Sequence, residues 1–282
     1  MPARRIGIWL WCIACFALVG CGSSSKPENE KISLKLNLTK GENRKMSIES
    51  TMNMMGKGSS EGAKVSMDAE LSLGVIDIND DGLHVLTVKY DRLAIKMTGM
   101  PRTTEYDTSK PEEGNPYGKV MQPFVGQEFR FNVTPAGKTT VVGGFDELAD
   151  KLAASSRGNK DNFLQQLAGT KDSFDQSFAW YPPRPVAIGD TWTSVIRWPS
   201  NPTAPIRADI QCRLDGRKEG KAIIKVDGTV GSSTGITGTL SGTIIMDEQS
   251  GWTDNADLTM NMGSQGRGGP MDMAGVIKIK GT

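Results

Sequence analysis

The chain has 282 residues, with 33 basic and 32 acidic side chains and a formal net charge of +1. This near balance removes the strong electrostatic attraction on which nucleic-acid binding depends, so no nucleic-acid partner is expected. Apolar residues make up 37% and charged residues 23%, which allows a packed core and excludes wholesale disorder or an integral membrane bundle. The 33 glycines and 14 prolines predict many turns and few long helices.

The first residues have the layout of a signal peptide. Two arginines precede an apolar or small-residue run over 6–20, which is shorter than the roughly 20 residues that a membrane-spanning helix needs. Leu18-Val19-Gly20-Cys21 resembles the bacterial lipobox, whose cysteine is lipidated after cleavage. We predict a lipoprotein signal peptide over 1–20, cleavage between Gly20 and Cys21, and lipidation of Cys21. An ordinary secretory signal is the alternative.

The residues after the lipobox predict an anchored protein of the cell envelope. The segment 21–31 is small and polar, as a flexible tether should be. Its partner would be a membrane, reached through the lipid on Cys21. Gly22 stands where an aspartate would resemble an inner-membrane retention signal, so we expect the outer membrane and a periplasm-facing protein.

Cysteine use agrees with export followed by anchoring. Cys12 and Cys15 would leave with the signal peptide and Cys21 would carry lipid, which leaves Cys212 alone. No intramolecular disulfide is then possible in the mature chain, and its stability must come from the core. Cys212 lies in a strand-like stretch and is expected to be a buried apolar group.

Alternation of apolar and polar residues predicts antiparallel strands along most of the mature chain. Glycine-rich or Asp/Asn-rich turns separate them. The predicted strands are 32–38, 45–55, 64–78, 83–97, 128–133, 191–198, 206–214, 222–230, 237–246, 252–262 and 273–280. The segment 103–118 has turn formers and no period, and predicts a long loop.

Only one region follows a helical period. Apolar residues recur at steps of three and four between 144 and 179, beginning with Phe145, Leu148 and Leu152, which predicts two or three short amphipathic helices. The fold class is therefore mainly β, built from antiparallel sheets in a half-barrel or sandwich-like arrangement. We predict a first β half over 32–143, a helical insert over 144–180 and a second β half over 181–282. The order of turns in the two halves suggests an internal repeat.

Several phrases, taken in order, resemble a family of uncharacterised bacterial predicted lipoproteins, a domain-of-unknown-function family. The clearest are Phe124-Val125-Gly126-Gln127-Glu128-Phe129, Phe145-Asp146-Glu147-Leu148 and Phe178-Ala179-Trp180-Tyr181-Pro182, and the likeness covers 34–262. The resemblance implies a secreted, lipid-anchored, strand-rich domain. It brings no catalytic residues.

Motifs with catalytic chemistry lack their partners. Two stretches, 58–62 and 231–235, match the hydrolase pattern G-x-S-x-G, but both fall between predicted strands. His84 is the single histidine and shares a strand face with apolar residues, so neither a Ser-His pair nor a usual zinc site can be assembled. Asp77 to Gly82 matches half of a calcium loop and fits a hairpin turn better. We expect no enzyme, no metal and no cofactor.

Methionine supplies the remaining candidate site. Met52 and Met54 share one strand face, as do Met260 and Met262. Such pairs fit core packing, an adaptable apolar groove or a copper(I) site, with packing favoured. The expected function is a non-enzymatic envelope lipoprotein that binds or scaffolds another molecule. Two alternatives stay open: a carrier of lipid or another apolar ligand in a β-sheet groove, and an enzyme with an unidentified carboxylate site.

Overall fold

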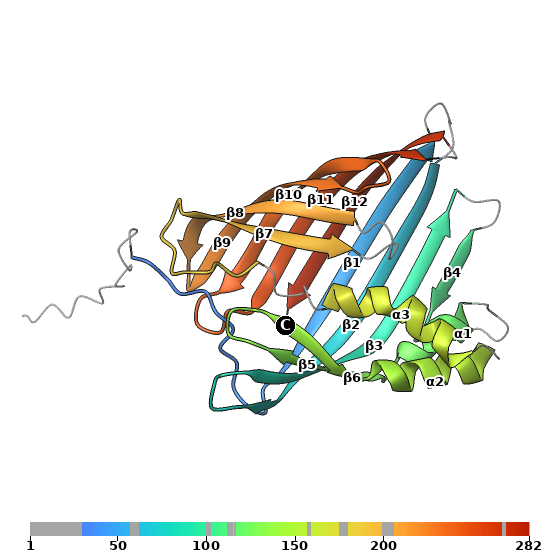
Figure 1. The fold of residues 1–282 in the computed structure, drawn as a ribbon, viewed down its shortest axis with the longest axis horizontal. Helices are drawn as coiled ribbons and strands as arrows, with labels where there is room; N and C mark the ends of the chain where they lie inside the picture. The colour runs from blue at the N-terminus through green and yellow to red at the C-terminus, as the bar shows by residue number, and fades with distance from the viewer. Residues whose placement is uncertain are drawn as a thin grey trace, which may run out of the picture.

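A single curved antiparallel sheet makes up most of the molecule (Figure 1). The computed structural model describes residues 30–56, 62–99, 103–111, 115, 117–156, 159–174, 180–198, 206–266 and 269–281. The predicted signal peptide and Cys21 lie outside the described residues.

The sheet has twelve strands. Their bounds are β1 (Asn43–Gly56), β2 (Gly62–Ile78), β3 (His84–Thr98), β4 (Thr104–Asp107), β5 (Glu128–Val133), β6 (Thr139–Gly143), β7 (Thr191–Trp198), β8 (Ile206–Lys218), β9 (Lys221–Gly231), β10 (Ile236–Asp247), β11 (Thr253–Gly266) and β12 (Gly269–Gly281). They follow the order β6-β5-β3-β2-β1-β12-β11-β10-β9-β8-β7, and β4 pairs with β3. The mainly β, antiparallel prediction is confirmed.

The pairing of β1 with β12 joins the two predicted halves. These strands lie side by side over eleven residue pairs, with Ser50 opposite Ile277 near the middle. The strands of each half otherwise follow one another as meanders, and both run across the sheet in the same sense. The two halves therefore form one continuous sheet, and the sandwich alternative is wrong.

The two faces of the sheet differ in chemistry because side chains alternate along every strand. The concave face carries rows of apolar residues, such as Ile48 on β1 and Ile277 on β12. The convex face carries polar and charged residues, and Lys278 stands there between Glu49 and Asp257 of the neighbouring strands. Opposite charges in such cross-strand positions stabilise the register of β1, β12 and β11.

Two helices fill the space between the edges of the sheet. They are α2 (Phe145–Ser156) and α3 (Lys160–Phe174), and two shorter elements, α1 (Gly118–Met121) and η1 (Gln122–Phe124), precede them. Phe145, Leu148 and Leu152 of α2 are all buried, as their spacing predicts. Helix α3 contacts both edge strands, β6 and β7, and thereby covers edges that would otherwise invite pairing with another chain.

The segment 30–38, named the strap here, crosses one end of the sheet. Ile32, Leu34, Leu36 and Leu38 are buried, as their alternation predicts. The predicted strand is nevertheless wrong, because the only ladder contact of the described strap is an isolated bridge between Ile32 and Val186. Its other backbone hydrogen bonds go to turns, from Leu36 to Pro135 and from Asn37 to Ser250.

The strap seals what we call the closed end of the sheet. The β5–β6 and β10–β11 turns meet it there. Arg217 and Glu248 pair beside it through two hydrogen bonds of 2.8 and 2.7 Å, and the guanidinium also donates to the carbonyl of Glu30. Gly251 touches the strap so closely that a Cβ at that position would lie 2.1 Å from the Lys35 oxygen.

The opposite end, called the open end, holds the β1–β2, β9–β10 and β11–β12 connections. One further sequence prediction needs correction: the described part of 103–118 is not a plain loop. It contains β4, whose buried Tyr106 packs under α1, and its last residue, Gly118, begins that helix. A strand and a helix of four residues each are too short to produce a recognisable period.

Candidate functional site

The four methionines predicted as a groove come together on the concave face. Met52 lies on β1 and Met260 on β11, and Gly275 of β12 stands between them in the register of the three strands. A Cβ at Gly275 would lie 3.9 Å from the Met52 Cε and 4.0 Å from the Met260 Cε. The two thioether side chains therefore lean over the bare backbone of Gly275 from both sides.

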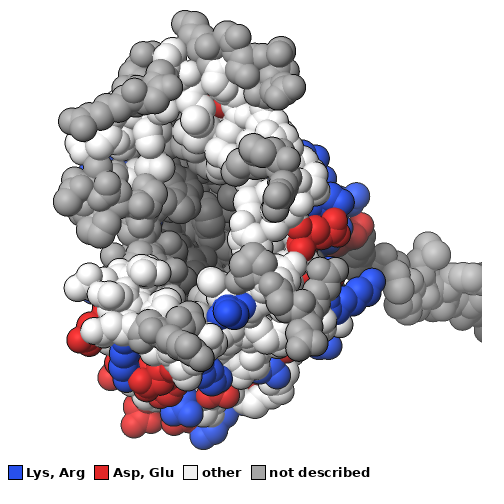
Figure 2. Space-filling view, turned by 90° about the vertical axis from the view of Figure 1, so that its right-hand side faces the viewer, with Lys and Arg blue, Asp and Glu red and all other residues white. Residues whose placement is uncertain are grey.

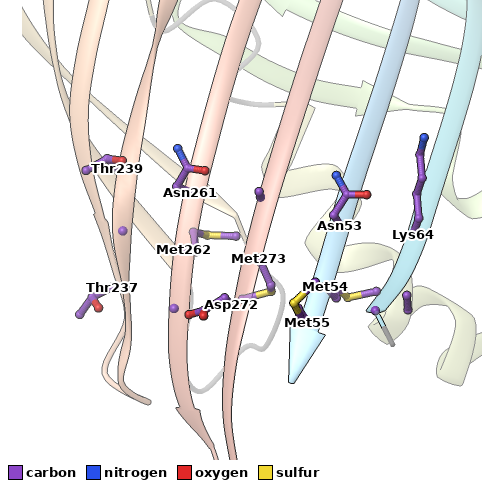
Figure 3. A pocket seen from close by; sticks show the side chains of 15 residues that line it. Asn53, Met54, Met55, Lys64, Thr237, Thr239, Asn261, Met262, Asp272 and Met273 are labelled. Atoms are coloured by element: carbon purple, nitrogen blue, oxygen red, sulfur yellow. The ribbon is translucent and has the colours of Figure 1, made fainter. Parts of the chain in front are cut away.

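The next row toward the open end repeats this arrangement. Met54 and Met262 both stand opposite Met273 of β12, so three methionines lie abreast (Figure 3). The Met262 Cγ lies 2.9 Å from where a Cβ of Gly238 would be, which shows that the side chain lies flat on the neighbouring strand. Flexible, polarizable methionine chains on a glycine-lined sheet form a surface that can adapt to an apolar ligand.

Part of this apolar surface is open to solvent. Met67 and Met271, both on the concave side of the register, are 41% and 40% exposed. Met55, at the tip of β1, is 52% exposed. Met55 lies on the convex face beside Asp272, whereas Met67 lies near the middle of the concave face and Met271 at its open end. Large apolar side chains are normally buried, so the exposed Met67 and Met271 mark the part of the concave face that is open to solvent.

An apolar cavity of about 210 Å³ lies deeper in the curve of the sheet. Its walls include Leu73, Leu86, Phe131, Ile244 and Ile279, together with the rings of Trp180 and Trp252. Among its fourteen lining residues only Thr139 and Thr253 carry a hydroxyl group, and none carries a charge. A space of this composition suits a hydrocarbon group and offers a charged group no partner.

A second, shallower groove of about 730 Å³ crosses β10, β11, β12, β1 and β2 near the open end. Figure 3 shows its polar side chains in rows on either side of the methionine row, with Asn53, Asn261 and Thr239 along one row and Asp272 and Thr237 along the other. Strand alternation assigns both polar rows to the convex side. Near the open end, consecutive residues of each strand therefore alternate between the apolar concave face and the polar convex face.

The space-filling view agrees with this distribution. Figure 2 shows the molecule hollowed on the side turned toward the viewer, where most of the described rim is uncharged. Lysine, arginine, aspartate and glutamate gather on the lower outer surface. A ligand that enters the hollow therefore passes a described rim that is mainly uncharged.

His84, the first residue of β3, has a structural role because it holds the end of the strap. It is 4% exposed and lies on the concave side with Leu86, as the strand pattern predicts. Its Nε2 accepts a hydrogen bond of 3.2 Å from the backbone N–H of Leu38. That bond fastens the end of the strap to β3 and occupies the nitrogen that a general base would use.

The sequence motifs that match catalytic or calcium-binding patterns form turns where the structure describes them. The motif at 231–235 is the β9–β10 turn, in which Ser232 Oγ accepts hydrogen bonds from the backbone of Thr234 and Ile236. It lies at the open end, a strand length away from His84. The motif at 58–62 is outside the described residues apart from Gly62. Asn79 Oδ1 accepts a hydrogen bond from Leu83 N–H in the β2–β3 hairpin, as expected of a turn.

The titratable groups of buried Cys212 and partly buried Asp247 serve the fold. Cys212 is 0% exposed, and burial raises the pKa of its thiol to about 12. Burial also disfavours the charge of Asp247, but hydrogen bonds from Lys221 and Ser250 prevail and hold its pKa well below the usual range. Within the described ranges, no group of three or more His, Cys, Asp or Glu side chains could hold a metal ion. No described helix is long and apolar enough to cross a membrane.

Sequence reasoning missed the deeper half of the site. The aromatic rings of Trp180, Trp252 and Phe131 line the cavity, although nothing in their local sequence links them. Residues of β12, which stands between the two methionine strands, were missed for the same reason. The available signal was the period of two in 273–280, which puts Met273, Ile277 and Ile279 on one face.

Comparison with known proteins identifies a family. A family described as "Family of unknown function (DUF6263)" matches residues 81–253, about three fifths of the chain and from the β2–β3 turn to the first residue of β11. No curated protein matches the chain. The predicted membership of a family of unknown function is confirmed, whereas lipid anchoring stays a prediction.

Proposed function

The chain belongs to DUF6263, a family of unknown function, and we propose that it binds an apolar ligand, such as a lipid acyl chain, on its concave face. The observation that carries the proposal is the uncharged cavity of about 210 Å³ that lies on the same face as the methionine rows. Apolar surface removed from water contributes roughly 25 cal/mol per Å², so an acyl chain would gain affinity along the whole path.

The path has two parts with different physical properties. The deep part is walled by the branched and aromatic side chains of the core, which hold a fixed shape. The outer part is lined by Met52, Met54, Met260, Met262 and Met273, whose unbranched chains can change rotamer to follow a ligand. The rigid deep part should therefore select the shape of the ligand's inner end, whereas the methionine-lined outer part should accept ligands that differ in the rest of their length.

The cellular setting of the proposal comes from the sequence. Lipidation of Cys21 would hold the protein at an envelope membrane, with the outer membrane favoured by Gly22. In that setting the protein is a non-enzymatic binding protein for lipid. The alternative roles are a scaffold that acts through protein contacts and an enzyme that uses a carboxylate site. Two carboxylates with lowered pKa, Asp107 of β4 and Asp247 of β10, are held in ion pairs with Arg92 and Lys221, which fits a structural role.

The test uses a soluble form that begins at Gly22 and a series of saturated fatty acids of increasing length. Each methylene buried in the path contributes about 0.8 kcal/mol, so the Kd should fall about fourfold per methylene until the path is full. Titration by displacement of a fluorescent fatty acid measures this slope, and native mass spectrometry gives the stoichiometry.

Dicarboxylic acids of equal length provide the matched control. They carry a second charge at the end that would enter the cavity, where no charged or ionisable side chain could pair with it among the lining residues. We expect them to bind at least tenfold more weakly. A Kd that does not change with chain length, or equal binding of both series, would refute apolar binding and favour the scaffold role.

A further inference from the structure

The place where the tether joins the folded protein limits how the hollow can face the membrane. The strap begins at Glu30, whose carbonyl accepts a hydrogen bond from Arg217 beside the β8–β9 turn, at the closed end. Figure 1 shows the strap at the left of the molecule, and Figure 2 shows the hollow from the right. The attachment point and the opening therefore lie on opposite sides.

The tether is short compared with the sheet. Nine peptide steps separate Cys21 from Glu30, and a fully extended chain of that length spans at most about 32 Å. A flexible chain of the same length averages only about 15–18 Å between its ends. Strand β1 has 14 residues and runs from the closed to the open end, which corresponds to about 44 Å.

These lengths exclude one orientation. If the open end touched the membrane that holds Cys21, Glu30 would stand about 44 Å above that membrane, beyond the reach of even a fully stretched tether. The lipid on Cys21 is equally unable to fold back into the open end. A protein lying on its side, or standing on its closed end, satisfies the tether.

We infer that the open end does not rest on the anchoring membrane, so that the apolar ligand reaches that end on a soluble carrier protein. This inference rests on the proposed function and on lipidation of Cys21. The chemistry of the open end fits such a partner: Met55 and Met271 are exposed there, and Lys64 and Asp272 nearby have opposite charges. An anionic membrane surface would instead call for a cluster of basic side chains.

The test uses the full-length lipidated chain on vesicles and a pyrene-labelled phosphatidylglycerol, which leaves a bilayer slowly. Trp180 and Trp252 line the cavity and can transfer excitation energy to a bound pyrene. The labelled lipid is supplied either in the vesicles that hold the protein or from solution as a cyclodextrin complex, which stands in for a soluble carrier. The matched variant has 24 Gly/Ser residues inserted after Ser25, which adds about 80 Å to the maximum reach of the tether.

We expect the native tether to allow uptake from solution and to make uptake from its own vesicles at least tenfold slower than in the insertion variant. Equal rates from its own vesicles for both tethers would overturn the inference. Failure of the insertion variant to take up lipid from its own vesicles, while it takes up soluble lipid, would also overturn it. No uptake from solution by either form would instead refute ligand binding itself, and with it the proposed function.

Discussion

Gly275 allows a charge to be placed in the proposed ligand path without a backbone clash. Its nearest neighbours leave an added Cβ at ordinary contact distances of 3.5 to 4.0 Å. In Gly275→Asp the carboxylate would emerge between the Met52 and Met260 side chains, in the middle of the methionine rows. The adjacent Ala274 points to the opposite face and is exposed, so Ala274→Asp adds the same charge outside the path.

The size of the effect follows from what the ligand must do. An acyl chain that covers the new carboxylate buries an unpaired charged group, and even an uncharged polar group costs about 1–3 kcal/mol in such a position. A chain that avoids it gives up about two methylenes, or roughly 1.6 kcal/mol. Both routes predict that the Kd rises at least tenfold in Gly275→Asp.

Displacement of a fluorescent fatty acid measures the Kd of both variants, and thermal unfolding checks that each is folded. Ala274→Asp should bind within twofold of the unchanged protein. Gly275→Ala should also bind normally and should be slightly more stable, because it reduces the freedom of the unfolded chain. Unchanged affinity in a folded Gly275→Asp protein would show that the ligand does not cross the methionine rows, and the proposed path would be wrong.

Three further predictions test the closed end and the core. Gly251 and Gly220 both have a positive φ, but only Gly251 touches the strap. Gly220→Ala should lower the free energy of unfolding by about 1–2 kcal/mol, whereas Gly251→Ala should lower it more and should speed hydrogen exchange at 36–38. Equal effects of the two substitutions would contradict the role of Gly251 in sealing the closed end. The lowered pKa of Asp247 contributes stability that is present above the usual carboxyl range and is lost as the pH falls through the folded-state pKa. In Asp247→Asn, the free energy of unfolding in urea should therefore fall less between about pH 5 and 2 than in the unchanged protein. An equal fall in both proteins would assign the pH dependence to other groups. Cys212, with its raised pKa, should react with a thiol reagent at pH 8 only on unfolding, and rapid labelling of the folded Gly22 form would show that it is accessible.

The sequence predicts the strands well because in most of them one face is less exposed than the other. In β5 and β7 the predicted bounds match the structure, and in β2 they differ by two residues at one end. Alternation reports that a face is buried, but it does not identify the neighbouring strand. The contact of β1 with β12 joins residues more than 200 positions apart, so the choice between one sheet and two domains could not be made from local pattern.

The strap shows the same limit. Its four buried leucine and isoleucine side chains produce the alternation of a strand. Hydrogen bonds to turns replace the ladder, because the strap crosses the ends of the strands rather than lying along one of them. Period two therefore predicted the burial of Leu34 and Leu36 correctly and their membership of the sheet wrongly.

For the candidate site, side-chain alternation along the strands predicted that Met52 shares a face with Met54 and that Met260 shares a face with Met262. Alternation does not identify the neighbouring strands, which only the strand order of the sheet gives. Only when β12 lies between β1 and β11 do the two pairs become one surface. The cavity required still more distant information, since Trp180, Trp252 and Phe131 come from separate elements. For a site that is assembled from several strands, the sequence predicts which residues share a strand face. The shape of the site depends on how the tertiary fold arranges those strands.

The division of the molecule into a sealed end and an open end follows from its chemistry. Cys212 is the cysteine of the described residues, and it is free, so their stability comes from burial, which the strap, α2 and the turns concentrate at the closed end. The same sheet continues to the open end, where its concave side stays apolar and partly exposed. An exposed apolar surface favours aggregation unless something covers it. Curvature withdraws most of this surface into the hollow, and α3 covers the edge strands, so a ligand of matching chemistry remains the occupant that the concave face fits best.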